Sequence, residues 1–222
     1  WEYLFDFPNI RAAELIQYSS KKEKLHFKKL NLNNKIFVTC NFINRLFYKR
    51  NSKKINIRKK LHLNENCFLI LFVGRITFIK GLDLLIPAFK KVTKKIPNSK
   101  LLIVGANNEM FLEKKILPLI REQKIENNVI IHHPVSLENL KNIYDNADVF
   151  VLPSYREGLP RSALEALASG RPIITTNTPG CRETVVSGKN GIMVPPTQYP
   201  AWLHYLLRQN PWLNWQSQGN NH

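Results

Sequence analysis

Two glutamates that stand eight positions apart, Glu157 and Glu165, are the residues of this chain whose type and spacing point most directly to chemistry. Glu157 lies in a polar stretch, and Glu165 lies in the Ala/Leu-rich segment that follows it and stops at Gly170. Pro160 suits the first turn of a helix and Gly170 suits the position just after one, so this segment is predicted to be a short helix.

A helix start at this point would bind phosphate, because its free N–H groups and partial positive charge favour anions. The stretch therefore predicts a phosphate-bearing ligand between Glu157, Glu165 and the helix start. The alternative is a surface loop followed by an acidic residue near a helix start, which needs no ligand.

Two cations, Arg75 and Lys80, flank a turn that follows the apolar run 68–73. An arginine grips a diphosphate with two hydrogen bonds and a lysine adds a point charge, while Gly81 lets the backbone pass close to a ligand. The chain has no GxxxxGK[ST] sequence and no GxGxxG sequence after a strand, which argues against P-loop ATPases and NAD enzymes. Taken alone, the two cations are also compatible with a solvated loop.

Apolar runs that alternate with helical segments must position these side chains. The predicted strands are 68–73, 101–104, 129–131, 149–152, 173–175 and 191–194, and helices are predicted over about 82–96, 109–123 and 137–145 and before Gly170. This alternation predicts an α/β fold, a Rossmann-like parallel sheet flanked by helices. Ligands of such sheets bind outside the carboxyl ends of the strands. Polar residues of this chain gather at those ends, which favours the ligand site over the surface loop.

The segments on either side of this region carry weaker patterns. Residues 11–18 predict a helical turn or two, 36–40 a short strand, 57–61 a helix and 202–207 a short helix. Pro87 falls inside the helix predicted from residue 82, and we expect it to kink that helix or to mark a distorted first turn.

The composition is that of a globular protein with an anionic partner. The 222 residues are 44% hydrophobic and carry a formal net charge of +17, with many of the cations before residue 61. This charge predicts binding to a nucleotide, nucleic acid or an acidic membrane surface. Nucleic acid is the least favoured of these, because no binding motif accompanies the charge. The three cysteines lack metal-site spacing, no apolar run approaches the roughly 20 residues of a membrane span, and a cytoplasmic location is expected.

Three short motifs stand in order along the chain: Gly74-Arg75…Lys80-Gly81, Glu157-x7-Glu165 and Pro179-Gly180-Cys181-Arg182-Glu183. Over about residues 61–197 they resemble the donor-binding half of retaining glycosyltransferases of the family-4 type, which have the GT-B fold. The sequences around the last two motifs are most similar to bacterial enzymes that build capsule, O-antigen or lipid-linked oligosaccharides.

The resemblance implies a role for each matching residue. Arg75 and Lys80 would bind the donor diphosphate and stabilise the leaving nucleoside diphosphate, and Glu157 would accept hydrogen bonds from the donor sugar, so these three are the expected catalytic residues. Glu165 would hold the ribose. Further donor contacts are expected from Gly74, Val135, Gly158, Leu159, Pro160, Arg161 and Gly180. The resemblance implies no metal ion, and the glutamates would bind and orient rather than act as the acid and nucleophile of a glycosidase.

The resemblance also implies how the chain is divided and what it does. Residues 1–60 are expected to be a remnant of an acceptor domain and a linker, 61–197 the nucleotide-sugar-binding domain, and 198–222 a truncated tail. The expected function is retaining transfer from a UDP-hexose or UDP-N-acetylhexosamine to a glycan or polyprenyl-diphosphate-linked acceptor, with little activity from this chain alone. The alternative is a non-catalytic nucleotide-sugar-binding subunit that requires a separate acceptor-domain partner. Peripheral attachment to the inner face of the plasma membrane is compatible with the charge.

Overall fold

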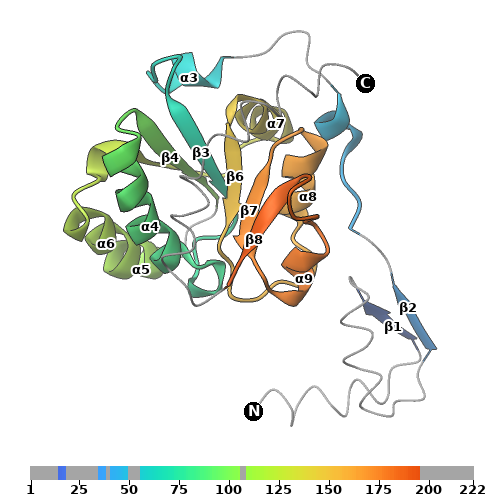
Figure 1. The fold of residues 1–222 in the computed structure, drawn as a ribbon. Coiled ribbons are helices and arrows are strands. Elements are labelled where there is room, and N and C mark those ends of the chain that lie inside the picture. Colours follow the sequence, from blue (N-terminus) through green and yellow to red (C-terminus); the bar gives the residue numbers. More distant parts are fainter. Residues whose placement is uncertain (1–14, 19–34, 39–40, 50–55, 106–108, 196–222) are drawn as a thin grey trace.

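A six-stranded parallel sheet with helices on both faces forms the centre of the structure (Figure 1). This computed structural model describes residues 15–18, 35–38, 41–49, 56–105 and 109–195. The strands of the sheet are β3 (Phe68–Val73), β4 (Ser99–Val104), β5 (Val129–His132), β6 (Val149–Leu152), β7 (Ile173–Thr176) and β8 (Gly191–Val194). The predicted α/β fold with a Rossmann-like parallel sheet is confirmed.

The order of the strands creates a reversal in the middle of the sheet. The order is β5-β4-β3-β6-β7-β8, and β3 pairs in parallel with both β4 and β6. The chain runs outward from β3 through β4 to β5, returns to the middle, and runs outward the other way from β6 to β8. The carboxyl ends of β3 and β6 therefore flank the topological switch point, where open α/β sheets bind their ligands.

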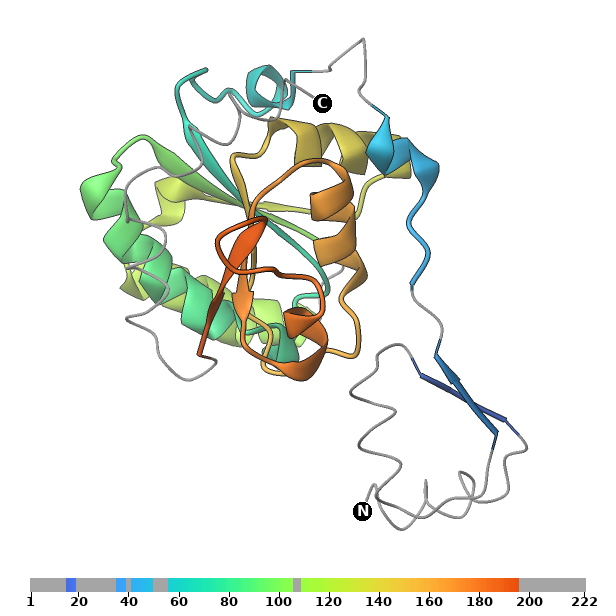
Figure 2. The same cartoon turned by 45° about the vertical axis from the view of Figure 1, so that its right-hand side comes forward.

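Helices cover both faces of this sheet. Figures 1 and 2 show α4 (Leu82–Lys95), α5 (Glu109–Phe111) and α6 (Leu117–Glu122) on one face and α7 (Leu137–Asn146) and α8 (Arg161–Ala168) on the other. Short helical turns complete the fold: η1 (Arg45–Tyr48), α3 (Ile57–Lys60), η2 (Phe78–Lys80), η4 (Glu126–Asn128) and α9 (Pro179–Arg182). Helix α4 continues through Pro87, whose missing N–H removes only one hydrogen bond of the helix, the one to the carbonyl of Asp83.

The core lies between the two helical layers. Strands β3 and β6 are continuous apolar runs. All of their side chains after Phe68 are buried, as expected for strands that are covered on both faces. Phe47 of η1 joins this core with only 1% of its surface exposed. Burial of a side chain of this size stabilises the fold by about 2 kcal/mol. Phe47 therefore anchors η1 to the domain.

The helix predicted over residues 109–123 is present but contains a π-helical turn. This turn, η3 (Leu112–Ile116), joins α5 to α6 and ends just before Pro118. Proline has no N–H group to donate to the carbonyl four residues earlier, and such interruptions are where π turns occur. The pattern of apolar residues indicated a helix but not its local widening.

The prediction for residues 11–18 was wrong over its second half. Leu15–Tyr18 forms the strand β1, which pairs in parallel with β2 (Lys35–Val38) in a separate two-stranded sheet. Pairing with a distant strand overrode a weak local helix preference. The prediction of a strand at 36–40 is confirmed up to Val38, that of a helix at 57–61 is confirmed as α3, and the helix expected at 202–207 lies outside the described residues.

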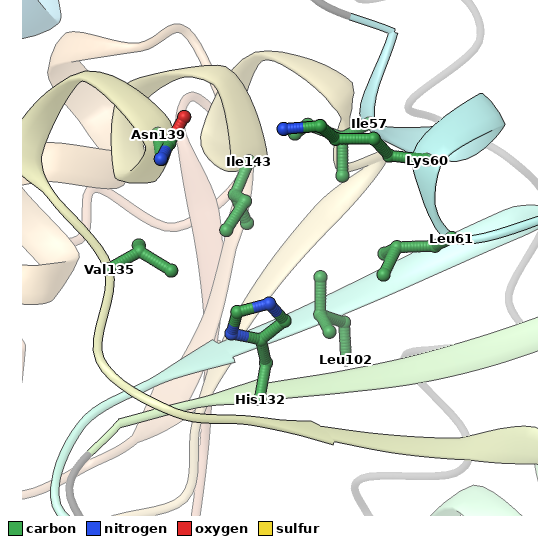
Figure 3. Close-up of a pocket in the computed structure, with 8 residues that line it drawn as sticks. All are labelled: Ile57, Lys60, Leu61, Leu102, His132, Val135, Asn139 and Ile143. Atoms are coloured by element: carbon green, nitrogen blue, oxygen red, sulfur yellow. The ribbon is translucent and has the colours of Figure 1, made fainter.

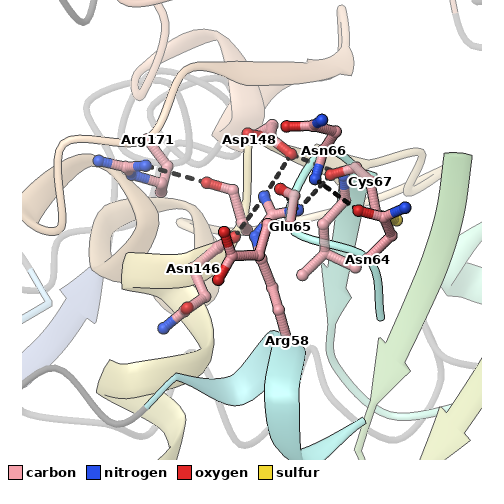
Figure 4. Close-up of polar contacts among 10 residues, drawn as sticks. Arg58, Asn64, Glu65, Asn66, Cys67, Asn146, Asp148 and Arg171 are labelled. Atoms are coloured by element: carbon pink, nitrogen blue, oxygen red, sulfur yellow. Dashed lines mark hydrogen bonds and ion pairs between the residues drawn. The ribbon is translucent and has the colours of Figure 1, made fainter. Parts of the chain in front are cut away.

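Arg58 of α3 ties the segment before β3 to the amino-terminal edge of the sheet (Figure 4). Its Nη2 atom lies 2.7 Å from Oδ2 of Asp148 and donates to the carbonyl of Asn146 over 3.0 Å, while Nη1 donates to the carbonyl of Cys67. Asp148 also accepts a 2.6 Å hydrogen bond from the backbone N–H of Leu69. These contacts fix the end of the sheet opposite to the switch point. The loops after β3 and β6 lie at the other end.

Candidate functional site

The loops that follow β3 and β6 are packed together at the switch point. The backbone N–H of Tyr155 donates to the carbonyl of Ile79 over 2.8 Å, and the ring of Tyr155 stacks on that of Phe78 with centroids 5.1 Å apart. The Tyr155 hydroxyl donates to Oδ2 of Asp83 over 2.7 Å, and burial together with this carboxylate raises the pKa of Tyr155 to about 12. Two stretches about 75 residues apart in sequence therefore form one unit.

Gly81 makes this close packing sterically feasible. It has a φ of +68° and follows η2, so it ends that turn and begins α4. A Cβ atom at this position would lie 2.1 Å from the carbonyl oxygen of Pro153 in the other loop. Any side chain would push the two loops apart.

Lys80 and Glu157 meet in this unit. Nζ of Lys80 lies 2.5 Å from Oε1 of Glu157, and the hydroxyl of Ser154 donates to the same oxygen over 2.6 Å. Both side chains are mostly buried, with 18% and 11% of their surfaces exposed. The structure thus brings together one cation and one carboxylate that the sequence assigned to a single site.

Arg75 lies in the same loop as Lys80 but is exposed. Its side chain forms no ion pair or hydrogen bond with the residues that the structure describes. Its guanidinium therefore remains available to an anion.

Glu165 sits on the buried side of α8. Its Oε1 atom accepts a 3.1 Å hydrogen bond from Nε of Arg161, one turn earlier, and Oε2 accepts a 3.3 Å hydrogen bond from the hydroxyl of Tyr144. Burial raises the pKa of Glu165, while Arg161 and Tyr144 act in the opposite direction. Glu165 thus lies one turn into α8, enclosed between Arg161 and Tyr144.

The start of α8 presents backbone donors. Pro160 occupies the position just before the helix, and no side chain caps it. The carbonyl of Pro160 accepts hydrogen bonds from the N–H groups of Ala163 and Leu164. The N–H groups of the first helical residues lack such acceptors within the helix and can serve an anion.

Gly180 of α9 packs closely against the backbone of the loop that carries Glu157. A Cβ atom at Gly180 would lie 1.9 Å from the carbonyl oxygen of Gly158 and 2.5 Å from that of Glu157. The hydroxyl of Thr176, at the end of β7, donates to the carbonyl of Ser154. The loop that carries Glu157 is therefore braced by the carboxyl-terminal side of β7 and by α9.

Val135 lies in a different hollow (Figure 3). This pocket is enclosed by α3, α7 and the strands β4 and β5, and its lining residues are Ile57, Lys60, Leu61, Leu102, His132, Val135, Asn139 and Ile143. It is mainly apolar. The structure thus groups Lys80 with Glu157, and Arg161 with Glu165, and places Val135 in the loop between β5 and α7.

Several residues that are not among the predicted site residues hold these groups in place. Ser154 is three positions before Glu157, so its spacing within one loop was a readable signal. Tyr144 contacts Glu165 from another helix, and Asn41 donates a 2.6 Å hydrogen bond from its Nδ2 atom to the carbonyl of Leu159. These last two contacts depend on tertiary structure, and nothing in the local sequence indicates them.

Neither a metal centre nor a membrane span is found in the described part of the chain. No three His, Cys, Asp or Glu side chains there come close enough to hold a metal ion. Among the same residues, no helix has the length and apolar character needed to cross a bilayer.

Comparisons with known proteins agree on one family. The sequence profile of the glycosyl transferases group 1 matches residues 53–208. CapM, a capsular polysaccharide biosynthesis glycosyltransferase of Staphylococcus aureus, is 34% identical over 199 residues, which are 86% of this chain and 50% of CapM. The chain thus spans about half the length of this relative.

Solved structures show the same fold. Sucrose-phosphate synthase from Thermosynechococcus elongatus has a TM-score of 0.78 at 24% identity, over 96% of this chain and 56% of that one. HepE from Anabaena, solved with UDP and glucose, has a TM-score of 0.79 at 21% identity, over 93% of this chain and 58% of that one. With the profile matching most of the sequence, the chain belongs to the glycosyl transferases group 1.

Proposed function

We propose that residues 61–197 are the donor-binding half of a retaining glycosyltransferase of GT-B architecture. The observation that carries this proposal is the contact between Lys80 and Glu157 at the switch point, 2.5 Å apart, with the exposed Arg75 in the same loop as Lys80. A nucleotide sugar has a diphosphate, which needs cations, next to a sugar, whose hydroxyls need acceptors. The two kinds of group lie side by side here.

Each group has a role in this proposal. Arg75 and Lys80 bind the diphosphate and neutralise the charge that develops on the leaving nucleoside diphosphate. Glu157 accepts hydrogen bonds from the sugar hydroxyls, and Glu165 accepts them from the ribose. Backbone groups of Gly74 and of residues 158–161 line the path between them, Gly180 holds this loop in place, and Val135 flanks the base.

The contact between Lys80 and Glu157 also suggests how donor binding proceeds. Lys80 pairs with Glu157, and Ser154 donates to the same carboxylate oxygen. Binding of the diphosphate draws Lys80 towards the phosphate oxygens and frees lone pairs of Glu157 for the sugar. The acceptor hydroxyl then attacks from the side of the leaving group, and the leaving phosphate takes up its proton, which gives retention without a residue acting as base.

The nature of the donor and acceptor is supported by relatives. HepE was solved with UDP and glucose, which supports a UDP-hexose or UDP-N-acetylhexosamine as the donor. CapM acts in capsular polysaccharide biosynthesis, which supports a glycan or polyprenyl-diphosphate-linked acceptor. We further propose that residues 1–60 belong to an acceptor domain and linker, that 198–222 are the tail of the donor domain, and that the positive charge favours an anionic membrane surface.

Calorimetric titration of the 222-residue chain tests the proposal. We expect UDP to bind more tightly than ADP or GDP, and to raise the midpoint of thermal unfolding through linkage. Arg75→Ala and Lys80→Ala should each weaken UDP binding about tenfold or more, because each removes a charge-assisted hydrogen bond to phosphate. Lys94→Ala, which removes an exposed cation from the end of α4, is the control for net charge.

Two results would contradict the donor site. One is the absence of both binding heat and a thermal shift at millimolar UDP. The other is an equal loss of affinity in Lys94→Ala and in the two loop variants, because that would assign the binding to overall charge.

A further inference from the structure

Tyr144 is a wholly buried residue of α7 whose hydroxyl reaches α8. Its single O–H hydrogen is shared between two acceptors, the carbonyl of Ser162 at 3.0 Å and Oε2 of Glu165 at 3.3 Å. Burial raises the pKa of Tyr144 well above its usual range, so the hydroxyl stays protonated and remains a donor at physiological pH. Glu165 thus has a fixed neutral donor on one oxygen and Arg161 on the other.

The ring of Tyr144 is itself held on two sides. The ring of Phe47 packs edge-on against it with centroids 5.8 Å apart at 79°, and Phe150 of β6 packs at 5.8 Å and 50°. Phe47 comes from the segment 41–49, which precedes the sheet. The same segment reaches the candidate site a second time, through the hydrogen bond from Asn41 to the carbonyl of Leu159.

We propose that Tyr144 is a positioning residue for the carboxylate of Glu165, and that Phe47 fixes Tyr144, so that the segment 41–49 is a structural part of the donor site. This inference rests on the proposed function, in which Glu165 holds the ribose.

The hydrogen-bonding capacity of the carboxylate supports this assignment. An ionised carboxylate accepts about four hydrogen bonds, and Tyr144 and Arg161 use two of them. The two that remain match the two neighbouring hydroxyls of a ribose. Arg161 is 58% exposed at its side chain and can turn aside, whereas Tyr144 is enclosed. Tyr144 is therefore the partner that sets the rotation of the carboxylate about its last bond.

Tyr144→Phe tests this role, because it removes the hydroxyl and keeps the ring between Phe47 and Phe150. The probes are UDP and 2′,3′-dideoxy-UDP, which lacks both ribose hydroxyls. We expect the variant to bind UDP about fivefold more weakly, the effect of one lost hydrogen bond to a charged group, and to bind the dideoxy nucleotide as the unaltered chain does. Lys94→Ala, which removes an exposed cation from the end of α4 and lies outside the proposed site, should keep the preference for UDP.

Further variants separate positioning from folding. In a chain that already carries Glu165→Gln, Tyr144→Phe should cause no further loss of the preference, because Tyr144 acts through the carboxylate. Phe47→Leu should lower the preference in the same direction while binding of the dideoxy nucleotide is kept. Arg75→Ala, by contrast, should weaken binding of both nucleotides equally.

Three outcomes would overturn the inference, and they can be told apart. Full preference for UDP in Tyr144→Phe would show that Tyr144 only packs. Equal binding of both nucleotides by the unaltered chain would remove the ribose role of Glu165, and the positioning role with it, while nucleotide binding stands. Binding of neither nucleotide would remove the proposed function itself.

Discussion

Glu157 and Glu165 are both carboxylates, but their surroundings suit them to different partners. Glu157 shares a loop with a serine hydroxyl and contacts the ammonium of Lys80, which an incoming diphosphate can attract away. Glu165 is enclosed and meets a neutral hydroxyl and an exposed arginine side chain. We infer that Glu157 changes its partners when the donor binds, whereas Glu165 is set in place beforehand.

Glu165→Gln tests this contrast through its pH dependence. Burial raises the pKa of Glu165 in the folded chain, so between its ordinary value and that raised value the folded state holds more protons than the unfolded state. The free energy of unfolding therefore falls as pH rises through this window, and the cost of the buried charge is fully present above it. We expect the glutamine variant to be at least as stable as the unaltered chain at pH 7, yet to bind UDP more weakly.

Urea unfolding at several pH values, with UDP titrations at pH 7, measures both effects. Acidification through the window should stabilise the unaltered chain relative to the variant. If the variant is instead less stable than the unaltered chain at pH 7, and the difference in their free energies of unfolding does not change with pH, the carboxylate is not held at a raised pKa.

At the residue scale, the sequence predicted which side chains carry charge and not how they are held. The spacing of Glu157 and Glu165 and the cations after β3 were readable because they lie in loops that follow strands or in the helix that follows such a loop. Tyr144 and Phe47 carry no such signal. Their contacts depend on how α7, α8 and η1 pack, and an aromatic residue in an apolar pattern is usually a core residue.

At the scale of elements, the site depends on loops that approach each other too closely for side chains. Gly81 and Gly170 have the same φ of +68°, but a Cβ atom at Gly81 would lie 2.1 Å from a carbonyl oxygen of the other loop, whereas none would be within 4 Å at Gly170. Comparing substitutions at the two glycines therefore separates the free-energy cost of a left-handed backbone from the cost of a steric clash.

Gly81→Ala and Gly170→Ala make this comparison. We expect Gly170→Ala to lower the free energy of unfolding by about 1 kcal/mol, the strain of a left-handed alanine. Gly81→Ala should lower it by about 3 kcal/mol or more, because the same strain is joined by a clash that shifts Pro153. It should also weaken UDP binding. Equal losses in urea unfolding would show that the two loops separate at little cost.

The elements were predicted well where the apolar pattern was long. The strands of the sheet are runs buried on both faces, and the turns between them contain glycine, asparagine or proline. The prediction failed at Leu15–Tyr18, a strand whose partner is β2, and it missed the π turn at Leu112–Ile116. Both depend on pairing or packing that a local pattern does not contain.

At the scale of the whole molecule, the proposed function gives the described domain one wall of a two-domain site. Its relatives are about twice the length over which they match this chain. The exposed Arg75 and the start of α8 belong to loops at the carboxyl end of the sheet, where a second domain would face them. Phe47 and Asn41 tie the segment before the sheet to this domain, through the ring of Tyr144 and the carbonyl of Leu159.

Sugar transfer is expected to require an acceptor-binding half in addition to this chain. An acceptor-binding half, taken from CapM of Staphylococcus aureus, is mixed with this chain or fused before it, and sugar transfer is followed with labelled UDP-sugars that bind in titrations. We expect the chain alone to bind donor without transfer, because in the proposed arrangement a second domain holds the acceptor hydroxyl near the sugar. Adding the second half should give transfer that Arg75→Ala and Glu157→Gln abolish. Transfer by the chain alone would contradict the two-wall arrangement, and donor binding without transfer in every combination would favour a non-catalytic nucleotide-sugar-binding subunit.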